Sequence, residues 1–170
     1  MVRGRKNPGY ERFPSRLRKA LRSAGQGQTV PAARSTLAGW EQGLRVPRID
    51  AVEQVSYALG LSPAFLAFGI EADSCQPAEG LRCAGVASRL RQIRTARGLT
   101  VLALATAAGL SHSAVRSTET ESSIPSIATV EAFAIALGVS PGWLAYGLGP
   151  VELRRRRRVA ASPAPSPNTV

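Results

Sequence analysis

Residues 98–125 read GLTVLALATAAGLSHSAVRSTETESSIP, and this stretch decides the fold. Thr100 and Ser111 are good N-cap residues, and each is followed by apolar residues at helical spacing. Gly109 stands between them, where a helix has to end in a left-handed residue. The stretch therefore predicts two short helices joined by a tight turn.

The second of these helices has an outer face suited to contact a partner. Val115 points inward, whereas His112, Ser113 and Arg116 are left on the outer face. Two short helices around a tight turn are the layout of a helix-turn-helix, in which the second helix is presented to DNA. These three outward side chains are therefore candidate base readers.

The charge of the chain favours an acidic partner. Its 170 residues carry a formal charge of +11, so nucleic acid is the first expectation and an anionic membrane surface the second. Residues 1–48 hold 11 of the 22 Lys and Arg residues, which makes the front of the chain its electrostatic side. Aromatic residues make up only 5%, too few to stack the bases of a single strand.

The residue types argue against several other classes of protein. With one His, two isolated Cys residues and no glycine-rich phosphate loop, no catalytic set, metal site or cofactor site can be assembled, so we expect no enzyme. No apolar run approaches the roughly 18 residues of a membrane span, and no targeting signal is visible. We therefore expect a cytoplasmic, nucleoid-associated protein that does not bind membranes. No ligand-sensing domain is visible, so no small-molecule effector is indicated.

An internal repeat sets the architecture. Residues 57–71, YALGLSPAFLAFGIE, align with residues 135–149, IALGVSPGWLAYGLG, at a constant offset of 78. At the front of the two copies, Arg16-Leu17-Arg18 matches Arg89-Leu90-Arg91 at an offset of 73. The first copy is thus five residues shorter. The deficit falls in residues 25–34, GQGQTVPAAR, where two glycines and a proline support about one helical turn at best.

The predicted fold class is all-α, with tandem five-helix units and disordered basic termini. The units are a disordered basic arm at 1–14, a first domain with a shortened second helix at 15–70, a linker at 71–84, a second domain at 85–149 and an Arg-rich disordered tail at 150–170. The predicted helices span 15–24, 34–41, 49–59, 63–68, 86–96, 101–108, 112–119, 127–137 and 141–145. Ser62 is expected to cap the helix at 63–68. Cys75 and Cys83 fall in the linker as reduced thiols without a role, the alternative being a redox role.

At this level of detail the chain resembles the lambda-repressor-like (Cro/XRE-type) helix-turn-helix family. In the second copy the resemblance rests on the RLRQIRTARGLT opening from Arg89, the AAGLSHSAV turn and the ALGVSPGWL close. In the first copy, residues 36–47, TLAGWEQGLRVP, resemble the family's step of a hydrophobic residue, two residues, Glu, any residue, Gly, a basic residue and Pro. The resemblance implies binding of double-stranded DNA through the major groove, usually to regulate transcription.

Carried over residue by residue, the resemblance assigns roles to particular side chains. Thr100 and the amides after it would hold a phosphate at a helix N-terminus. The base-facing positions would be His112, Ser113 and Arg116 in the second copy and Arg34, Ser35 and Thr36 in the first. Ser111, Arg45 and Arg48 complete the predicted DNA-binding set.

The resemblance also implies an internal ion pair. In the second copy it would join Arg94 to Glu119. The first copy has no arginine at the corresponding position, so Arg18 or Arg22 would have to pair with Glu41.

One departure from the family pattern bears on which copy reads DNA. Glu121 replaces the expected glycine, and with Glu119 it places acids where phosphate contacts are expected, which weakens binding. The recognition helix of the first copy, residues 34–41, has the more basic surroundings. We therefore expect the first copy to contribute more to DNA affinity.

Two hypotheses follow for the function. The leading one is a sequence-specific DNA-binding transcriptional regulator, whose two copies could occupy half-sites about 34 Å apart, with a homodimer as an alternative arrangement. The competing one is a degenerate helix-turn-helix module that binds a protein partner or another copy of itself and has only non-specific affinity for nucleic acid.

Overall fold

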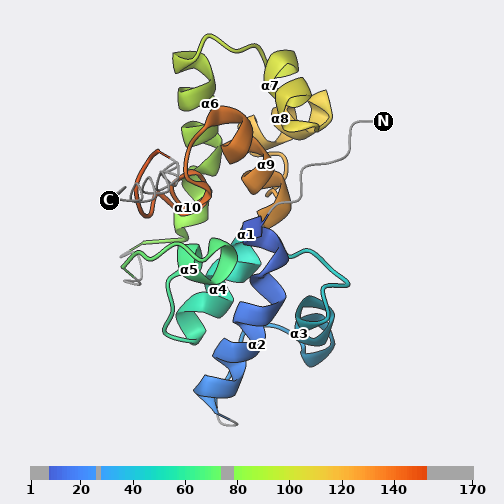
Figure 1. Ribbon diagram of the computed structural model, residues 1–170, viewed down its shortest axis with the longest axis vertical. Helices are drawn as coiled ribbons and strands as arrows, with labels where there is room; N and C mark the ends of the chain where they lie inside the picture. Colours follow the sequence, from blue (N-terminus) through green and yellow to red (C-terminus); the bar gives the residue numbers. More distant parts are fainter. Residues whose placement is uncertain (1–7, 26–27, 74–78, 153–170) are drawn as a thin grey trace, which may run out of the picture.

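The computed structural model describes residues 8–25, 28–73 and 79–152, and every regular element in these ranges is a helix (Figure 1). We call residues 8–73 the first half and residues 79–152 the second half. The first half holds α1 (Pro8–Glu11), α2 (Phe13–Ala24), α3 (Arg34–Glu41), α4 (Ile49–Ala58) and α5 (Pro63–Phe68). The second half holds a 3-10 turn, η1 (Arg82–Gly85), and then α6 (Val86–Ala96), α7 (Val101–Ala108), α8 (His112–Glu119), α9 (Ile127–Leu137) and α10 (Pro141–Tyr146).

Local signals account for the helix bounds of the second half. The hydroxyls of Thr100, Ser111 and Ser126 each accept a backbone hydrogen bond from the residue three positions later, which caps α7, α8 and α9. Gly109 and Gly138 end α7 and α9 in the left-handed conformation. α6 to α9 begin and end at the predicted residues, and α10 extends one residue beyond its prediction.

The front of the chain differs from the prediction. Residues 8–14 were expected to be disordered, yet α1 forms at Pro8–Glu11 and α2 begins at Phe13. The reason is tertiary, because the Phe13 ring is buried edge-on against Trp40, with ring centroids 6.5 Å apart. The rest of the predicted arm, residues 1–7, lies outside the described residues, as do residues 153–170 of the predicted tail.

The predicted short second helix of the first half is absent from its described part. Residues 28–33 contain no helix, and the Ala32 N–H donates to the Val30 carbonyl two residues back. Pro31 lies between them and cannot donate to a helix. Val30 and Ala32 nevertheless pack against the core. A non-helical segment therefore stands where the second half has α7.

The expected cap at α5 does not form. Ser62 occupies the N-cap position, but its hydroxyl makes no capping hydrogen bond and has no partner among the described residues. Its counterpart Ser140, at the start of α10, is in the same state. Proline follows each serine and fixes the first helical residue, so these helices start without a side-chain cap.

The two halves contact each other reciprocally, through positions that the 78-residue offset of the repeat relates. The Ile49 N–H donates to the Pro125 carbonyl and the Ile127 N–H donates to the Pro47 carbonyl, each at 3.1 Å. Ala64 lies so close to Gly142 that a Cβ on the glycine would be 3.0 Å from the alanine Cβ. The rings of Phe68 and Tyr146 lie 6.4 Å apart. These contacts run through the junction between α1–α5 and α6–α10 (Figure 1).

Two buried carboxylates hold the front of the opposite half. Glu53 of α4 accepts the Cys83 N–H at 2.9 Å, and Glu131 of α9 accepts the Tyr10 N–H at 2.8 Å. Charge-assisted hydrogen bonds of this kind are stronger than neutral ones. Cys83 is thus a buried residue of the interior rather than a linker thiol, and burial raises the pKa of its thiol. Cys75 lies outside the described residues.

Each half also contains an arginine that makes the same contact within that half. Arg16 Nε donates to the Leu66 carbonyl and Arg89 Nε donates to the Leu144 carbonyl, each at 2.9 Å. Each arginine thereby ties the first long helix of its half to the last helix of the same half. Burial lowers the pKa of Arg89.

No helix in the described ranges is long and apolar enough to cross a membrane.

Candidate nucleic-acid interface

α7 and α8 form two short helices around a tight turn. The Leu110 N–H donates to the Ala105 carbonyl at 2.9 Å and closes the turn over Gly109, whose φ is 66°. Leu104 of α7 and Val115 of α8 are fully buried, which fixes the two helices against the core. This geometry leaves the N-terminal end of α8 projecting from the molecule.

The outward face of α8 carries the predicted readers. His112, Ser113 and Arg116 are all exposed. The hydroxyls of Ser111 and Ser113 lie 2.9 Å apart, so the N-terminal turn of α8 has its own hydrogen bond. Arg116 has a long side chain with five donors and could form paired hydrogen bonds to a guanine edge.

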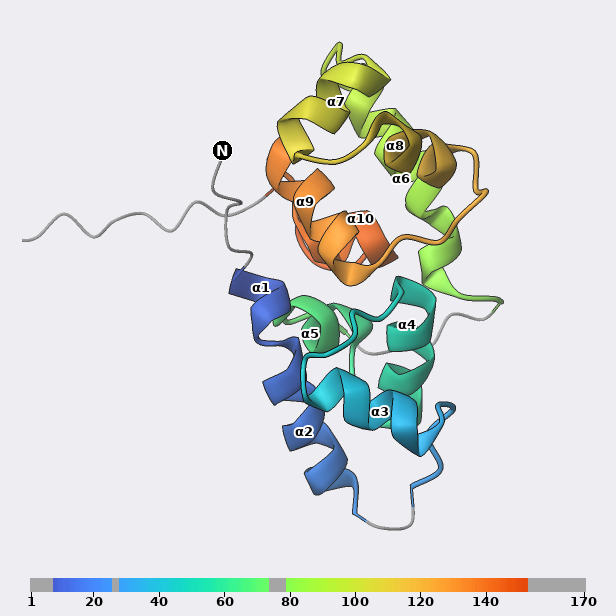
Figure 2. The ribbon, with the colours of Figure 1, turned by 90° about the vertical axis from the view of Figure 1, so that its right-hand side faces the viewer.

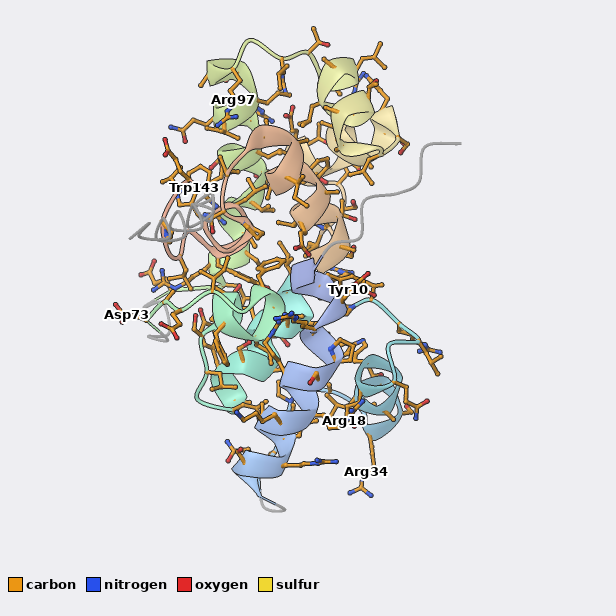
Figure 3. All side chains as sticks on the ribbon, viewed as in Figure 1. Tyr10, Arg18, Arg34, Asp73, Arg97 and Trp143 are labelled. Carbon is orange, nitrogen blue, oxygen red and sulfur yellow. The ribbon has the colours of Figure 1, made fainter. Side chains whose placement is uncertain are left out.

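α3 is the corresponding helix of the first half and offers a different set of side chains. Arg34 and Ser35 are exposed, whereas Thr36 is half-buried. Arg34 extends away from the body of the protein at the free end of α3 (Figure 3). Ala33 is the N-cap residue of α3 and provides no side-chain cap. α3 therefore starts more loosely than α8, but it begins with a positive charge.

Two more predicted arginines follow α3. Arg45 is exposed, with its stem against Gly39 of α3. Arg48 Nη2 pairs with Asp50 Oδ2 at 3.0 Å, and its side chain is 57% exposed. An exposed pair of this kind contributes little to stability and can exchange Asp50 for a phosphate. Both arginines are therefore accessible to an anionic partner.

The ion pair that the family resemblance implied is present in the second half. Arg94 Nε donates to Glu119 Oε1 at 2.6 Å and Arg94 Nη2 donates to Glu119 Oε2 at 2.9 Å. The hydrogen bond to Glu119 raises the pKa of Arg94. Both side chains are largely buried, at 13% and 8% exposure. Glu119 therefore faces inward and is neutralised, so our expectation that it opposes phosphate was wrong.

The first half has no equivalent ion pair among its described residues. Arg18 Nη2 donates to the backbone carbonyl of Glu41 at 2.7 Å and does not pair with the carboxylate. Arg91 makes the same backbone contact to Glu119, so Arg18 is the counterpart of Arg91 and not of Arg94. Arg22 is exposed. The expected ion pair of Arg18 or Arg22 with the Glu41 carboxylate is therefore not seen in the described residues.

Glu121 is the one residue of this region with a strained backbone. Its φ is 59°, and it is the only non-glycine residue with positive φ among those the structure describes. The corresponding residue of the first half is Gly43, with a φ of 71°. The second half thus has a left-handed residue after α8, as the first half has after α3, although a side chain stands where the first half has glycine.

α3 and the α7–α8 pair lie on the same side of the molecule (Figure 1), and Figure 2 views that side face-on. The structure thereby brings the helices that carry most of the predicted side chains to one side, although they are about 80 residues apart in sequence. Sequence reasoning missed Glu53 and Glu131, which hold the two halves together. Their signal was available, since the two carboxylates are 78 positions apart, which is the constant offset of the repeat.

Comparison with known proteins identifies part of this surface. Residues 90–144 match the family model described as Helix-turn-helix. These residues, about a third of the chain, are therefore similar to a helix-turn-helix segment. The match starts within α6, includes α7 and α8, and ends within α10, so it contains Thr100, Ser111 and the three readers of α8. A helix-turn-helix of this type indicates a DNA-binding protein in general. No curated protein and no solved structure matches the chain.

Proposed function

We propose that the protein is a sequence-specific regulator of transcription in which a single chain presents two recognition helices, α3 and α8, to double-stranded DNA. The observation that carries this proposal is the reciprocal set of contacts between positions that the 78-residue offset of the repeat relates. In an isologous interface residue i contacts residue j, and j contacts i. Ile49 with Pro125 and Ile127 with Pro47 have this form within one chain.

The reciprocal contacts support an internal duplication in which the first half is a second, diverged helix-turn-helix unit. Symmetric dimers of such units bind half-sites about 34 Å apart on one side of the duplex. A fused pair would present the same arrangement, and the position of α3 and α8 on one side of the molecule is in keeping with it (Figure 2). A second chain is then not required for binding, and the protein would act on DNA in the cytoplasm, at the nucleoid.

The two half-sites would be read by different side chains. α8 offers His112, Ser113 and Arg116, whereas α3 offers Arg34 and Ser35 as its exposed residues, with Thr36 partly covered. An arginine paired to a guanine edge contributes about 1–3 kcal/mol of discrimination. The binding site on DNA should therefore be an imperfect palindrome, with non-identical half-sites.

Phosphate contacts would also differ between the halves. The N-terminal amides of α7 are available to a phosphate beside the second half-site. The first half lacks that helix in its described part, so the exposed side chains of Arg45 and Arg48 would contact the backbone there. Charged side chains of this kind position the protein without reading sequence.

The test is selection of bound fragments from random duplex DNA, followed by titration of the winning sequence at fixed salt. Arg116→Ala should lower the affinity for that sequence about 5- to 150-fold, the equivalent of one lost guanine contact. Arg97→Ala is the matched control, because the Arg97 guanidinium lies beside Gly138 in the turn after α9. If no sequence is enriched, or if Arg97→Ala costs as much as Arg116→Ala, the proposal fails.

One observation favours the competing function, a module that binds a protein. Leu44, in the turn after α3, is 75% exposed, and Val46 is 42% exposed. Apolar side chains of this size on a surface are candidates for a protein contact. This function predicts a flat response to DNA sequence and partner binding that survives removal of Arg34 and Arg116.

A further inference from the structure

A cavity of about 280 Å³ lies behind the C-terminal end of α8. Its wall combines apolar side chains from the start of the second half with residues that follow α8. Val86 and Thr118 form part of the wall, and Asp50 reaches it from the first half. The volume suits a ligand of one or two rings rather than a larger molecule.

The same place in the first half is filled by two aromatic rings. At the offsets of the repeat, Val86 corresponds to Phe13 and Thr118 corresponds to Trp40. Phe13 is 1% exposed and Trp40 is 6% exposed, and their rings meet at an interplanar angle of 64°. The cavity therefore exists because Val86 and Thr118 are smaller than the two aromatic residues at the same positions of the first half. In the first half, aromatic rings fill the corresponding space.

The charged side chains of the cavity wall are acidic, and the remaining polar ones include the neutral hydroxyls of Thr118 and Ser123. Asp50 Oδ2 accepts from Arg48, but Asp50 Oδ1 is buried and has no hydrogen-bond partner among the described residues. A buried acceptor without a donor is costly, and a donor supplied by a ligand would remove that cost. Glu121 also contributes to the wall, and no Lys or Arg does. A cation therefore fits this cavity and an anion does not.

We propose that the cavity binds a small aromatic amine, with its ring against Val86 and Thr118 and its ammonium group at the Asp50 carboxylate. Amine binding is coupled to recognition of DNA, because the wall continues from Thr118 of α8 to Ile124. The next residue, Pro125, accepts the Ile49 N–H of the first half. The coupling rests on the proposed function, whereas binding of the amine does not.

The first experiment measures the affinity of the full chain for tryptamine by calorimetry. Indole-3-propionate carries the same ring with a carboxylate and should bind at least about tenfold more weakly, since a charge-assisted hydrogen bond is lost and repulsion is added. Asp50→Asn should weaken tryptamine binding by about tenfold or more. Asp73→Asn is the matched control, because Asp73 is exposed and does not line the cavity (Figure 3).

A second variant tests the location of the ring. Val86→Phe combined with Thr118→Trp copies the filled site of the first half and should abolish tryptamine binding. Circular dichroism shows whether that variant is folded. If it is not, two other comparisons decide whether the amine binds in the cavity: tryptamine with indole-3-propionate, and Asp50→Asn with Asp73→Asn. Equal affinity for tryptamine and indole-3-propionate, or unchanged binding by Asp50→Asn, would overturn the proposal.

The coupling is tested on the selected duplex. Saturating tryptamine should change the affinity for DNA by about fivefold or more, and DNA should change the affinity for tryptamine by the same factor. An unchanged affinity for DNA would overturn the coupling. Failure to bind any DNA sequence either with or without tryptamine would refute the proposed function and leave the amine site intact.

Discussion

The strained turn after α8 makes a quantitative prediction about Glu121. A side chain in the left-handed region costs about 1–2 kcal/mol relative to glycine, and the φ of Glu121 is 59°. Replacing Glu121 by glycine removes this strain. About 0.4–1 kcal/mol of the resulting stabilisation is lost again, because glycine raises the conformational entropy of the unfolded chain. Glu121→Gly should therefore stabilise the protein by about 0.5–1 kcal/mol.

The comparison that isolates the backbone is Glu121→Gly against Glu121→Ala. Both variants remove the carboxylate, but only glycine removes the Cβ that opposes a positive φ. In thermal unfolding followed by circular dichroism, Glu121→Gly should melt about 1–4 °C above Glu121→Ala, given the size of the chain. Both should bind DNA equally well and more tightly than the parent protein, since both remove one negative charge near α8.

The reverse change in the first half provides a second measurement. Gly43→Ala should destabilise the protein by about 0.5–1 kcal/mol, since the smaller entropy of the unfolded chain offsets part of the strain. The added Cβ would lie 3.7 Å from Pro14 Cγ, an ordinary contact, so the cost comes from the backbone alone. If Glu121→Gly melts no higher than Glu121→Ala, the left-handed turn is not the source of strain and this reasoning is refuted.

Four further predictions follow from the structure. Arg94→Ala should lower the free energy of unfolding by about 3–5 kcal/mol, because it leaves the Glu119 carboxylate buried and unpaired; Arg97→Ala should leave urea unfolding nearly unchanged. Stability should fall above about pH 9, because burial holds the pKa of Cys83 above its unfolded value, so that the unfolded thiol loses its proton first; Cys83→Ala should flatten this fall in urea titrations between pH 8.5 and 10. Replacing Arg34, Arg45 and Arg48 by Ala should cost more DNA affinity than replacing His112 and Arg116, and the opposite order at matched salt would contradict our ranking of the two halves. Deleting Val159–Val170 should leave DNA binding unchanged, whereas also removing Arg154–Arg158 should lower the slope of log affinity against log salt, which a titration of each deletion would measure.

Local chemistry was enough to predict most helix bounds. The hydroxyls of Thr100 and Ser111 and the left-handed Gly109 are short-range signals, and α7 and α8 begin and end where they indicate. The start of α2 could not be found in this way, because Phe13 is ordered by Trp40, which is 27 residues away. A helical pattern carries no information about a partner that far along the chain.

The candidate interface was predicted less completely, because burial decides what a charged side chain does. From the sequence, Glu119 and Glu121 were both expected to oppose phosphate, although the family resemblance also implied that Glu119 pairs with Arg94. Arg94 takes up the first in a buried ion pair, whereas the second remains exposed. Only the direction in which each side chain leaves the end of α8 separates them, and that direction depends on the left-handed turn at Glu121.

The asymmetry between the halves follows naturally if one chain supplies both recognition helices. In a symmetric dimer of identical chains, loss of a helix from one subunit removes it from both. In a fused pair each half can change alone, provided that the shared contacts survive. Glu53 and Glu131 preserve such contacts on both sides of the junction, while the first half lacks a counterpart of α7 in its described part and the second half has lost the glycine that corresponds to Gly43. The junction between the halves, rather than either helix-turn-helix alone, is then the part of the fold that binding to DNA requires.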